Sequence, residues 1–598
     1  PTRITLSIAN HIYSSSGVFY PSLTVTNRNQ LDSTFTKRIV ISPKASVSAT
    51  NPYYENFNTG TNGWYQETSE ISTNSTAVND SLWQWGTAVG TNINTSLNND
   101  KVWGTRTANP SMAYLQGEAG WVYSPCFDLS QLDQPMISLD IWRAAHRGID
   151  GAVLEYYDER TKTWNVLGEA SNYGLNWYQD GFVISHPGAQ TNGVPPIGWT
   201  GQSVDWENAR YALDHPHDDL QHQSNVRFRV AFASHINTIV GANEGFAFDN
   251  IFIGNRSQNT LIEHFSGLGY PGIEAIESDL YQMLDQSPYR EELSLIQYHT
   301  NMYSNDAFYN HNPLATNYRS YIYGVSNANK ALVNGRALTD STSELSLELL
   351  SQELLKDAKF DISFGSVPFV YTSTNSVHAA ITVQALEDLP LSRYALFVMI
   401  TEDSLLTSTG HLTQSVCREL INNEGTLYQQ AWVAGDTEVN TINFALKAGL
   451  NFNHLNITAF VQNELTREIY QVSSQPLYAS NTLPPHLGAI TGTVALDTNN
   501  NCLKDSLEIG LYGNVVEIQG NGISYTTSTD SLGIFNAIVD TGNYTLSIEN
   551  LNPYRILCTA LPTVYVPGIG VDTINLLVRD SILCPYLRVD ISAPFLRS

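Results

Sequence analysis

At 598 residues the chain is too long for one hydrophobic core, and at roughly 150 residues per domain it should contain about four domains. Its 57 acidic residues outnumber 30 basic ones, a net charge of −27 with no basic block, which excludes nucleic acid as a partner. Asn, Thr, Ser, Gly and Tyr are abundant and no run of about 18 apolar residues occurs, so we expect a mainly β, multidomain chain without direct membrane insertion.

The first predicted element is a β-hairpin. Residues 18–42 alternate between apolar and polar side chains on both sides of a turn at 27–30, and the second arm ends before Pro43. LTVTN at 23–27, followed by IVIS at 39–42, resembles the last two strands of a PKD-type immunoglobulin-like module. The resemblance implies that residues 1–43 are the end of such a module.

Residues 44–257 contain ten of the eleven tryptophans and many short strand patterns separated by polar turns. Short strands without helical periodicity predict a two-sheet β-sandwich. The segments YSPCFDLS (123–130), ISLDIWR (137–143) and EGFAFDNIFIG (244–254) resemble the MAM or concanavalin-like jelly rolls of secreted bacterial surface proteins. Trp83 and Trp85 would share one side of a strand, where they could stack on sugars if that side is solvated, or fill the core if it is not.

Two groups of polar residues in this segment could hold a metal ion. Asp249 and Glu55 could meet across a sheet and bind calcium, although a carboxylate at a strand end is usually solvated. His215 and His217 lie among acids in ALDHPHDDLQHQ, where a surface loop explains them better than a metal site, because metal ligands need one rigid element.

Residues 258–360 change to alternating strands and helices. Strand patterns at 260–265 and 293–298 flank an amphipathic helix that opens at Pro271, which predicts a βαβ unit, and 345–356 predicts a further helix. LIEHFSGLGYPG, SLIQYHTN and YGVSNANKALVNG resemble the thioredoxin-like domain of an outer-membrane lipoprotein family of Bacteroidota. Redox-active relatives carry Cys-x-x-Cys where this chain has GLGYPG, and a cis-proline near the position of Asn329, so the resemblance implies a structural or binding block without redox chemistry. The same family implies a β-sandwich over residues 361–482.

Beyond the Pro484-Pro485 linker, residues 487–580 open with GAITGTVALDTNNNCLKDSLEIGLYGNVVEI. This segment resembles the SD-repeat B-type and prealbumin-like modules of surface adhesins. The last residues, 581–598, resemble the first strand of a further β module. The fold class expected for the whole chain is therefore β-sandwich and jelly-roll modules in series, with one inserted thioredoxin-like α/β domain.

The loop 497–508 has the spacing of a calcium loop. Oxygen-bearing side chains stand at positions 1, 3, 5, 9 and 12, and a main-chain carbonyl is available at position 7. Position 6 is Cys502 rather than Gly, which puts the sharp turn of an EF-hand in doubt, and a polar hairpin turn without metal is the alternative. The predicted Ca²⁺ ligands are Asp497, Asn499, Asn501, Leu503, Asp505 and Glu508.

Five cysteines are too few for a disulfide scaffold and too scattered for a zinc cluster. Cys558 and Cys584 flank the end of the last full module and are favoured as a disulfide, but Cys502 competes as a partner for either. Cys126 and Cys417 lie in no motif with a His and an acid, so we expect unreactive single thiols.

These resemblances imply a non-catalytic segment of a large secreted, modular protein of the Bacteroidota cell surface, exported by type IX secretion. We expect a calcium-stiffened adhesive stalk or a subunit of an appendage or filament, with other surface proteins, glycans or further copies of itself as partners. The alternative function is the carbohydrate-binding accessory region of a secreted hydrolase, or a lectin. No catalytic residue is predicted.

Overall fold

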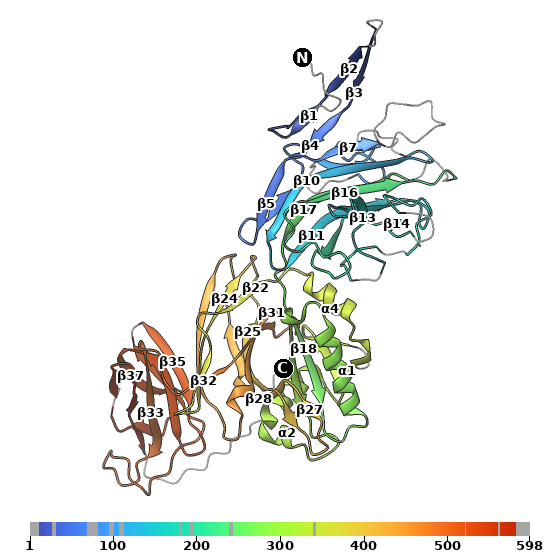
Figure 1. The fold of residues 1–598 in the computed structure, drawn as a ribbon. Coiled ribbons are helices and arrows are strands. Elements are labelled where there is room, and N and C mark those ends of the chain that lie inside the picture. The colour runs from blue at the N-terminus through green and yellow to red at the C-terminus, as the bar shows by residue number, and fades with distance from the viewer. Residues whose placement is uncertain are drawn as a thin grey trace. The chain divides into compact units, whose positions relative to one another are not determined.

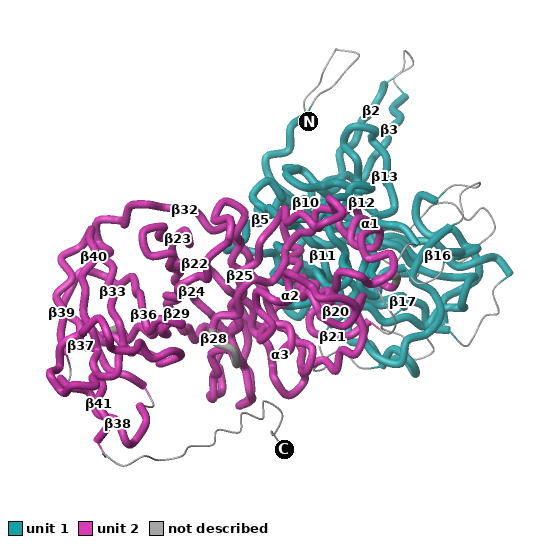
Figure 2. Tube along the Cα trace, turned by 90° about the horizontal axis from the view of Figure 1, so that it is seen from below, with its two compact units in different colours: residues 1–258, 283–290, 345–357 teal, residues 259–282, 291–344, 358–598 magenta. Residues whose placement is uncertain are grey.

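The computed structural model describes residues 11–26, 31–68, 82–94, 101–106, 113–170, 173–178, 181–190, 196–237, 243–338, 342–520, 522–549, 551–559 and 562–581. These residues form mostly strands in several separate sheets, which confirms the expected mainly β, multidomain fold class (Figure 1). The chain divides into two compact units, drawn in different colours in Figure 2. In the described part of the chain, no helix has the length and apolar character needed to cross a membrane.

The predicted N-terminal hairpin is present, with each arm broken in two. The strands are β1 (Gly17–Phe19), β2 (Ser22–Thr26), β3 (Asp32–Thr36) and β4 (Ile39–Ile41). β2 pairs antiparallel with β3, and β1 pairs antiparallel with β4. Leu23 lies opposite Phe35 with both side chains exposed, at 60% and 68%. The predicted turn at 27–30 lies outside the described residues.

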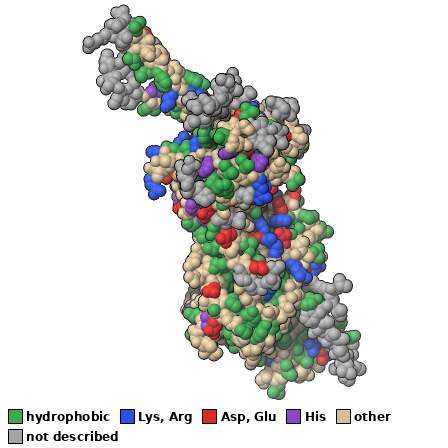
Figure 3. Space-filling view, turned by 90° about the vertical axis from the view of Figure 1, so that its right-hand side faces the viewer, with side chains coloured by type: hydrophobic (Ala, Val, Ile, Leu, Met, Phe, Trp, Pro, Cys, Tyr) green, Lys and Arg blue, Asp and Glu red, His purple; other side chains and the backbone are tan. Residues whose placement is uncertain are grey.

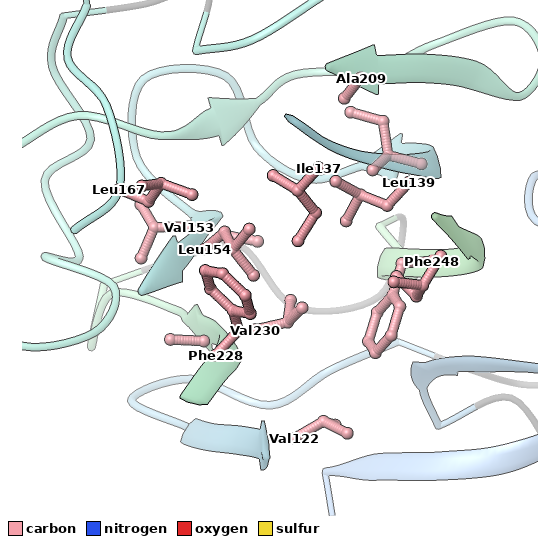
Figure 4. Close-up of a cluster of buried hydrophobic side chains, with 14 of the residues drawn as sticks. Val122, Ile137, Leu139, Val153, Leu154, Leu167, Ala209, Phe228, Val230 and Phe248 are labelled. Carbon is pink, nitrogen blue, oxygen red and sulfur yellow. The ribbon is translucent and has the colours of Figure 1, made fainter. Parts of the chain in front are cut away.

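Two sheets form the predicted sandwich of the tryptophan-rich segment. The larger contains β5 (Lys44–Ser48), β7 (Tyr65–Thr68), β10 (Ala119–Gln131), β12 (Gly151–Asp158), β13 (Thr163–Val166), β14 (Trp199–Thr200) and β16 (Val226–Ala233). The smaller contains β6 (Tyr53–Glu55), β8 (Trp83–Thr87), β9 (Lys101–Thr105), β11 (Pro135–Ala144), β15 (Glu207–Ala212) and β17 (Gly245–Asn255). Figure 4 shows Ile137 and Leu139 of the smaller sheet facing Val153 and Val230 of the larger in one buried core.

The βαβ prediction is confirmed by β18 (Thr260–Ser266), α1 (Ile273–Gln286) and β19 (Leu293–His299), because β18 and β19 pair in parallel. Three short helices follow: α2 (Ala307–His311), α3 (Pro313–Tyr323) and α4 (Leu347–Leu354). Ser346 caps α4, so this helix is shorter than the predicted 345–356.

One eight-stranded sheet crosses the predicted boundary at residue 360. β20 (Lys330–Val333) and β21 (Arg336–Ala337) join β18 and β19 at one end. At the other end β19 pairs with β28, so the sheet continues into strands of the segment 361–482. Those strands are β25 (Tyr394–Glu402), β28 (Val416–Tyr428), β30 (Leu455–Asn463) and β31 (Ile469–Pro476). The two predicted domains therefore share a sheet.

A second sheet packs on β25 and β30 and completes a sandwich. It contains β22 (Phe360–Phe364), β23 (Phe369–Tyr371), β24 (Ser376–Ala385), β29 (Thr437–Ala445) and β32 (Tyr478–Ser480). Ile381 and Val383 of β24 share a core with Val398 and Ile400 of β25. A separate small ribbon is formed by β26 (Leu405–Leu406) and β27 (Leu412–Thr413).

The segment 487–580 folds as two small sheets around one core that includes Ile490, Val516, Phe535 and Leu546. One sheet contains β33 (Leu487–Leu496), β36 (Ile534–Asp540), β38 (Arg555–Leu557), β40 (Val571–Thr573) and β41 (Leu576–Asp580). The other contains β34 (Val515–Gly520), β35 (Ile523–Ser528), β37 (Gly542–Glu549) and β39 (Thr563–Val566). The predicted calcium loop begins where β33 ends, and residues 582–598 lie outside the described residues.

Candidate metal loop and sheet-face pocket

The loop 497–508 is attached to the core of its module at its first residue. The N–H of Asp497 donates to the carbonyl of Val578 on β41 at 2.8 Å. Asp497 and Glu508, the first and last predicted ligands, are only 4% and 7% exposed, whereas the Leu503 side chain is 66% exposed. The carboxylates at the two ends of the loop are therefore buried. The Leu503 side chain points toward solvent, and its main-chain carbonyl is the group that could bind a cation.

The first half of the loop wraps around its own carboxylate. Asp497 Oδ1 accepts the N–H of Asn501 at 3.2 Å, and Oδ2 accepts the N–H of Cys502 at 3.0 Å. Desolvation acts against it, but hydrogen bonds from the Cys558 thiol and from loop N–H groups lower the pKa of Asp497 below its ordinary value. This carboxylate is therefore ionised over the usual pH range.

The sharp turn at position 6 forms although the residue is not glycine. Cys502 has φ +58°, in the left-handed region that glycine adopts most readily. Cys502 therefore has the backbone conformation that the sixth position of such a loop requires, and the calcium assignment itself stays a prediction.

The second half of the loop brings the other predicted ligands into the same network. Asp505 Oδ2 accepts the side-chain N–H groups of Asn499 at 2.6 Å and Asn501 at 2.9 Å. Glu508 Oε1 accepts the N–H of Thr498 at 3.2 Å, and its Oε2 accepts the N–H of Asp505 at 2.9 Å. Rotating the two Asn amides by a half-turn would direct their oxygens toward Asp505, which is the arrangement that a hard cation requires.

Two thiols lie close to Asp497: Cys502 within the loop and Cys558 outside it. Atoms of Asp497, Cys502 and Cys558 that could bind a metal all lie within 4.8 Å of one another, and this is the one cluster of three such residues found among the described residues. Cys558 Sγ donates to Asp497 Oδ2 at 3.1 Å. Burial, aided by hydrogen bonds to Cys502 and Asp497, raises the pKa of Cys558 to about 12. Cys584, the partner favoured from sequence, lies outside the described residues.

The tryptophan pair is not a sugar platform. Trp83 is 0% exposed, its Nε1 donates to the carbonyl of Gly120 at 3.0 Å, and its ring packs edge-on against Phe248. Trp85 is half-buried, and Lys101 Nζ lies 4.2 Å from the centre of its ring. The two residues do share one side of β8, as alternation predicts, but that side faces the core.

A pocket with a volume of about 320 Å³ and both polar and apolar lining residues lies instead on the outer face of the smaller sheet of this sandwich. Asp140 stands directly opposite Asn208, whose Nδ2 donates to Asp140 Oδ1 at 2.7 Å. Asn250 Nδ2 donates to Asp140 Oδ2 at 2.8 Å, and the Tyr54 hydroxyl donates to Asn250 Oδ1 at 2.8 Å. The remaining lining residues are Met136, Ser138, Arg210, Phe252 and Asp357.

This pocket was not predicted from the sequence, although the alternation in one strand indicated two of its residues. In the strand ISLDIWR, Ser138 and Asp140 alternate with buried Ile137, Leu139 and Ile141, so both polar residues had to face outward. The signal was incomplete because Asn208, Asn250 and Tyr54 come from strands distant in the sequence.

The other candidate metal residues have structural partners. Glu55 Oε1 accepts the N–H of Phe57 at 2.7 Å, and Asp249 lies on the neighbouring strand β17, so calcium between these two carboxylates stays a prediction. His217 Nδ1 lies 3.0 Å from Asp218 Oδ2, with its side chain 51% exposed, whereas His215 is 8% exposed.

The βαβ segment that begins at β18 has no cysteine at the end of its first strand. The loop 267–272 joins β18 to α1, and the N–H of Leu268 donates to Asp306 Oδ2 at 2.8 Å. Cys417 on β28 is 6% exposed, and burial raises its pKa to about 12, as expected for an unreactive thiol. Cys126 is half-buried, with its pKa raised mainly by desolvation.

No family model and no curated protein matches the chain. HBP35 of Porphyromonas gingivalis is similar in structure, at 12% identity and a TM-score of 0.33, over 53% of this chain and 99% of that one. The K1 cleaved adhesin domain of Lys-gingipain from P. gingivalis W83 has 10% identity and a TM-score of 0.19, over 34% and 98%. A structure of carbohydrate-binding modules from the beta-sandwich super family has 12% identity and a TM-score of 0.20, over 41% and 76%. Likenesses this weak assign no family or activity to the chain.

Proposed function

We propose that this chain is a non-catalytic segment of a large secreted cell-surface protein, in which calcium stiffens an adhesive stalk or an appendage or filament subunit. The observation that carries the proposal is the loop 497–508, where five oxygen-bearing side chains at calcium-loop spacing join one hydrogen-bond network. Type IX export and the PKD-like, jelly-roll, thioredoxin-like and SD-repeat B-type characters of the modules belong to the same proposal and rest on sequence resemblance.

The donor set fits calcium. Asp497, Asp505 and Glu508 supply carboxylates, Asn499 and Asn501 supply amide oxygens, and a main-chain carbonyl at position 7 completes a set of hard oxygen ligands. Bound calcium would neutralise the repulsion among these carboxylates and hold the loop in one conformation, which removes flexibility from the module. On the face drawn in Figure 3, the acidic side chains are scattered rather than gathered in one patch.

Calcium should therefore protect this loop and stabilise its module. At a free calcium concentration 100 times the Kd, the gain in free energy of unfolding should be about 2.7 kcal/mol. Lys504 lies within the loop, so trypsin can report directly on whether it is ordered. A chelator should lower the melting temperature of the full chain's C-terminal module and speed cleavage after Lys504.

Two variants make this test specific. Glu508→Gln should weaken calcium binding, measured by isothermal titration, by about tenfold or more, because it removes the charged ligand at position 12. Glu517→Gln is the matched control, since it removes the same charge from β34 outside the loop and should leave affinity unchanged. Equal cleavage after Lys504 with and without chelator would contradict the calcium assignment.

A second candidate function is glycan binding, as in a lectin or the accessory region of a hydrolase. The specific observation is the pocket around Asp140, where a carboxylate and the amides of Asn208 and Asn250 could hydrogen-bond to sugar hydroxyls. Tyr54 is 60% exposed beside them and offers an aromatic face for a sugar ring.

Glycan-array screening of the full chain tests this second function. If the wild-type chain binds a glycan, Tyr54→Ala should reduce that binding by about tenfold, because a stacking surface and a hydrogen bond are lost together. Tyr565→Ala removes a tyrosine of similar exposure, 61%, from β39 of another module and should have no effect. The pocket assignment fails if the array shows no ligand or if both variants bind equally well.

A further inference from the structure

β41 lies between β33 and β38 and pairs with both of them. Leu496 at the end of β33 and Leu557 at the end of β38 both lie opposite Val578. One residue further along each strand, Asp497 donates its N–H to the carbonyl of Val578, and Cys558 donates its N–H to the carbonyl of Leu577, each at 2.8 Å. Strand pairing therefore brings the ends of β33 and β38 to the same part of β41, where the side chains of Asp497 and Cys558 meet.

The turn at position 6 brings the second thiol to the same place. The N–H of Cys502 donates to Asp497 Oδ2 at 3.0 Å, and Cys558 Sγ donates to that same oxygen at 3.1 Å. Both sulfur atoms consequently lie within 4.8 Å of each other and of Asp497. Forming a disulfide bond requires side-chain rotation that brings the two sulfur atoms to about 2.05 Å.

We propose that Cys502 and Cys558 form a disulfide that fastens the loop 497–508 to the end of β38. A soft metal ion held by the two sulfurs and Asp497 is the competing occupant. The disulfide is favoured because the cluster among the described residues offers three ligand residues, whereas a structural site for a soft ion such as zinc takes four. An extracellular location, which is part of the proposed function, would also favour oxidation.

The chemistry balances with a small-molecule disulfide such as oxidised glutathione as the oxidant. One cysteine thiolate attacks the oxidant, releases one glutathione thiol and forms a mixed disulfide. The thiolate of the other cysteine attacks the protein sulfur of that intermediate and releases the second glutathione. The two cysteines lose two electrons and two protons in total, and the oxidant gains them.

The disulfide would also change the calcium affinity of the loop 497–508. This effect rests on the proposed function. In the reduced state Cys558 Sγ–H occupies Asp497 Oδ2. Oxidation removes that hydrogen, so the oxygen is left with one fewer donor and is more available to a cation. The disulfide should therefore raise calcium affinity, and calcium should favour the oxidised state by the same factor.

Tryptic mapping without reduction tests the disulfide on the full chain. Trypsin places Cys502 in peptide 468–504, Cys558 in peptide 556–579 and Cys584 in peptide 580–588, so each pairing gives a distinct product. After incubation with oxidised glutathione and alkylation of free thiols, we expect peptides 468–504 and 556–579 to be joined. The joined species should separate on reduction.

Variants and a chelator make each outcome decisive. Cys584→Ser should preserve the link and Cys502→Ser should abolish it, while Cys126→Ser controls for a remote thiol.

Oxidation should raise the melting temperature of the C-terminal module by about 10 °C in the wild type and leave it unchanged in Cys502→Ser. Peptides 556–579 and 580–588 joined instead, or thiols protected only by zinc and released by a chelator, would overturn the proposal. A link that forms without any calcium effect would leave the disulfide standing and count against the calcium loop alone.

Discussion

Replacing Arg319 with Met should lower the free energy of unfolding of the eight-stranded sheet and its helices by about 3–5 kcal/mol. Arg319 on α3 and Glu263 on β18 are both 0% exposed. Arg319 Nε and Nη2 donate to Glu263 Oε1 at 2.9 and 2.6 Å, and Nη1 donates to Gln462 of β30 at 2.8 Å. The substitution removes the guanidinium from a carboxylate that has no access to water, which is why the expected loss is large.

The groups around the Arg319–Glu263 ion pair satisfy its remaining hydrogen-bonding atoms. The hydroxyls of Tyr298 and Tyr323 donate to Glu263 at 2.9 and 2.6 Å. Burial alone would lower the pKa of Arg319, but the neighbouring Glu263 charge and the phenol groups raise it overall. The guanidinium is therefore charged in the folded state, and the pair joins β18, α3 and β30 as one unit.

Hydrogen exchange gives the cleanest measurement of this loss, because several modules unfold in the same chain and a single melting curve would mix them. Amides of β18 and α3 should lose protection in Arg319→Met. The matched control is Arg393→Met, whose ion pair with Glu464 is partly exposed and should contribute less than about 1 kcal/mol. Adding Glu263→Gln to Arg319→Met should recover part of the loss, and equal effects of the two Arg variants would refute the argument.

Replacing Trp83 with Ala should destabilise the β-sandwich of residues 44–257 by about 3–5 kcal/mol. The indole fills a fully buried site against Phe246 and Phe248, so its removal leaves a cavity. It also removes the donor to the Gly120 carbonyl. Exchange protection of amides in β8 and β10 is the appropriate measurement.

Trp85→Ala is the internal comparison, because Trp85 is two residues away and only half-buried. It should cost less stability than Trp83→Ala. The comparison also separates stability from recognition, since any loss of glycan binding in Trp83→Ala would follow from unfolding. If Trp83→Ala lost glycan binding while its amides kept their protection against hydrogen exchange, Trp83 would contact the sugar directly. That result would contradict the conclusion, drawn from burial, that Trp83 is a core residue.

Local patterns were sufficient for the elements themselves. Alternation predicted the hairpin and the strands of the sandwiches, and the switch to helical spacing after Pro271 predicted α1 between two parallel strands. The proposed calcium loop is also a local pattern, since its candidate ligands lie within twelve consecutive residues. Such features depend on spacing along the chain, which a sequence displays directly.

The boundary at residue 360 shows where local patterns stop being informative. Composition and resemblance separated residues 258–360 from 361–482, yet β19 pairs with β28 and Arg319 bonds to Gln462 across that boundary. A strand's own residues indicate that it is a strand, but its partner is chosen by the packing of the whole sheet. The shared sheet could therefore be seen only in three dimensions.

The sequence by itself determined the β character, the lack of cysteine in the GLGYPG loop and the spacing of oxygen-bearing side chains in 497–508. Only the tertiary structure decided that Trp83 is buried, that Asp140 meets Asn208 and Asn250, and that Cys558 lies beside Cys502 rather than being free for any partner. The physical reason is that alternation and spacing act between near neighbours in the chain, whereas burial and side-chain encounter depend on strands that are paired from distant parts of it.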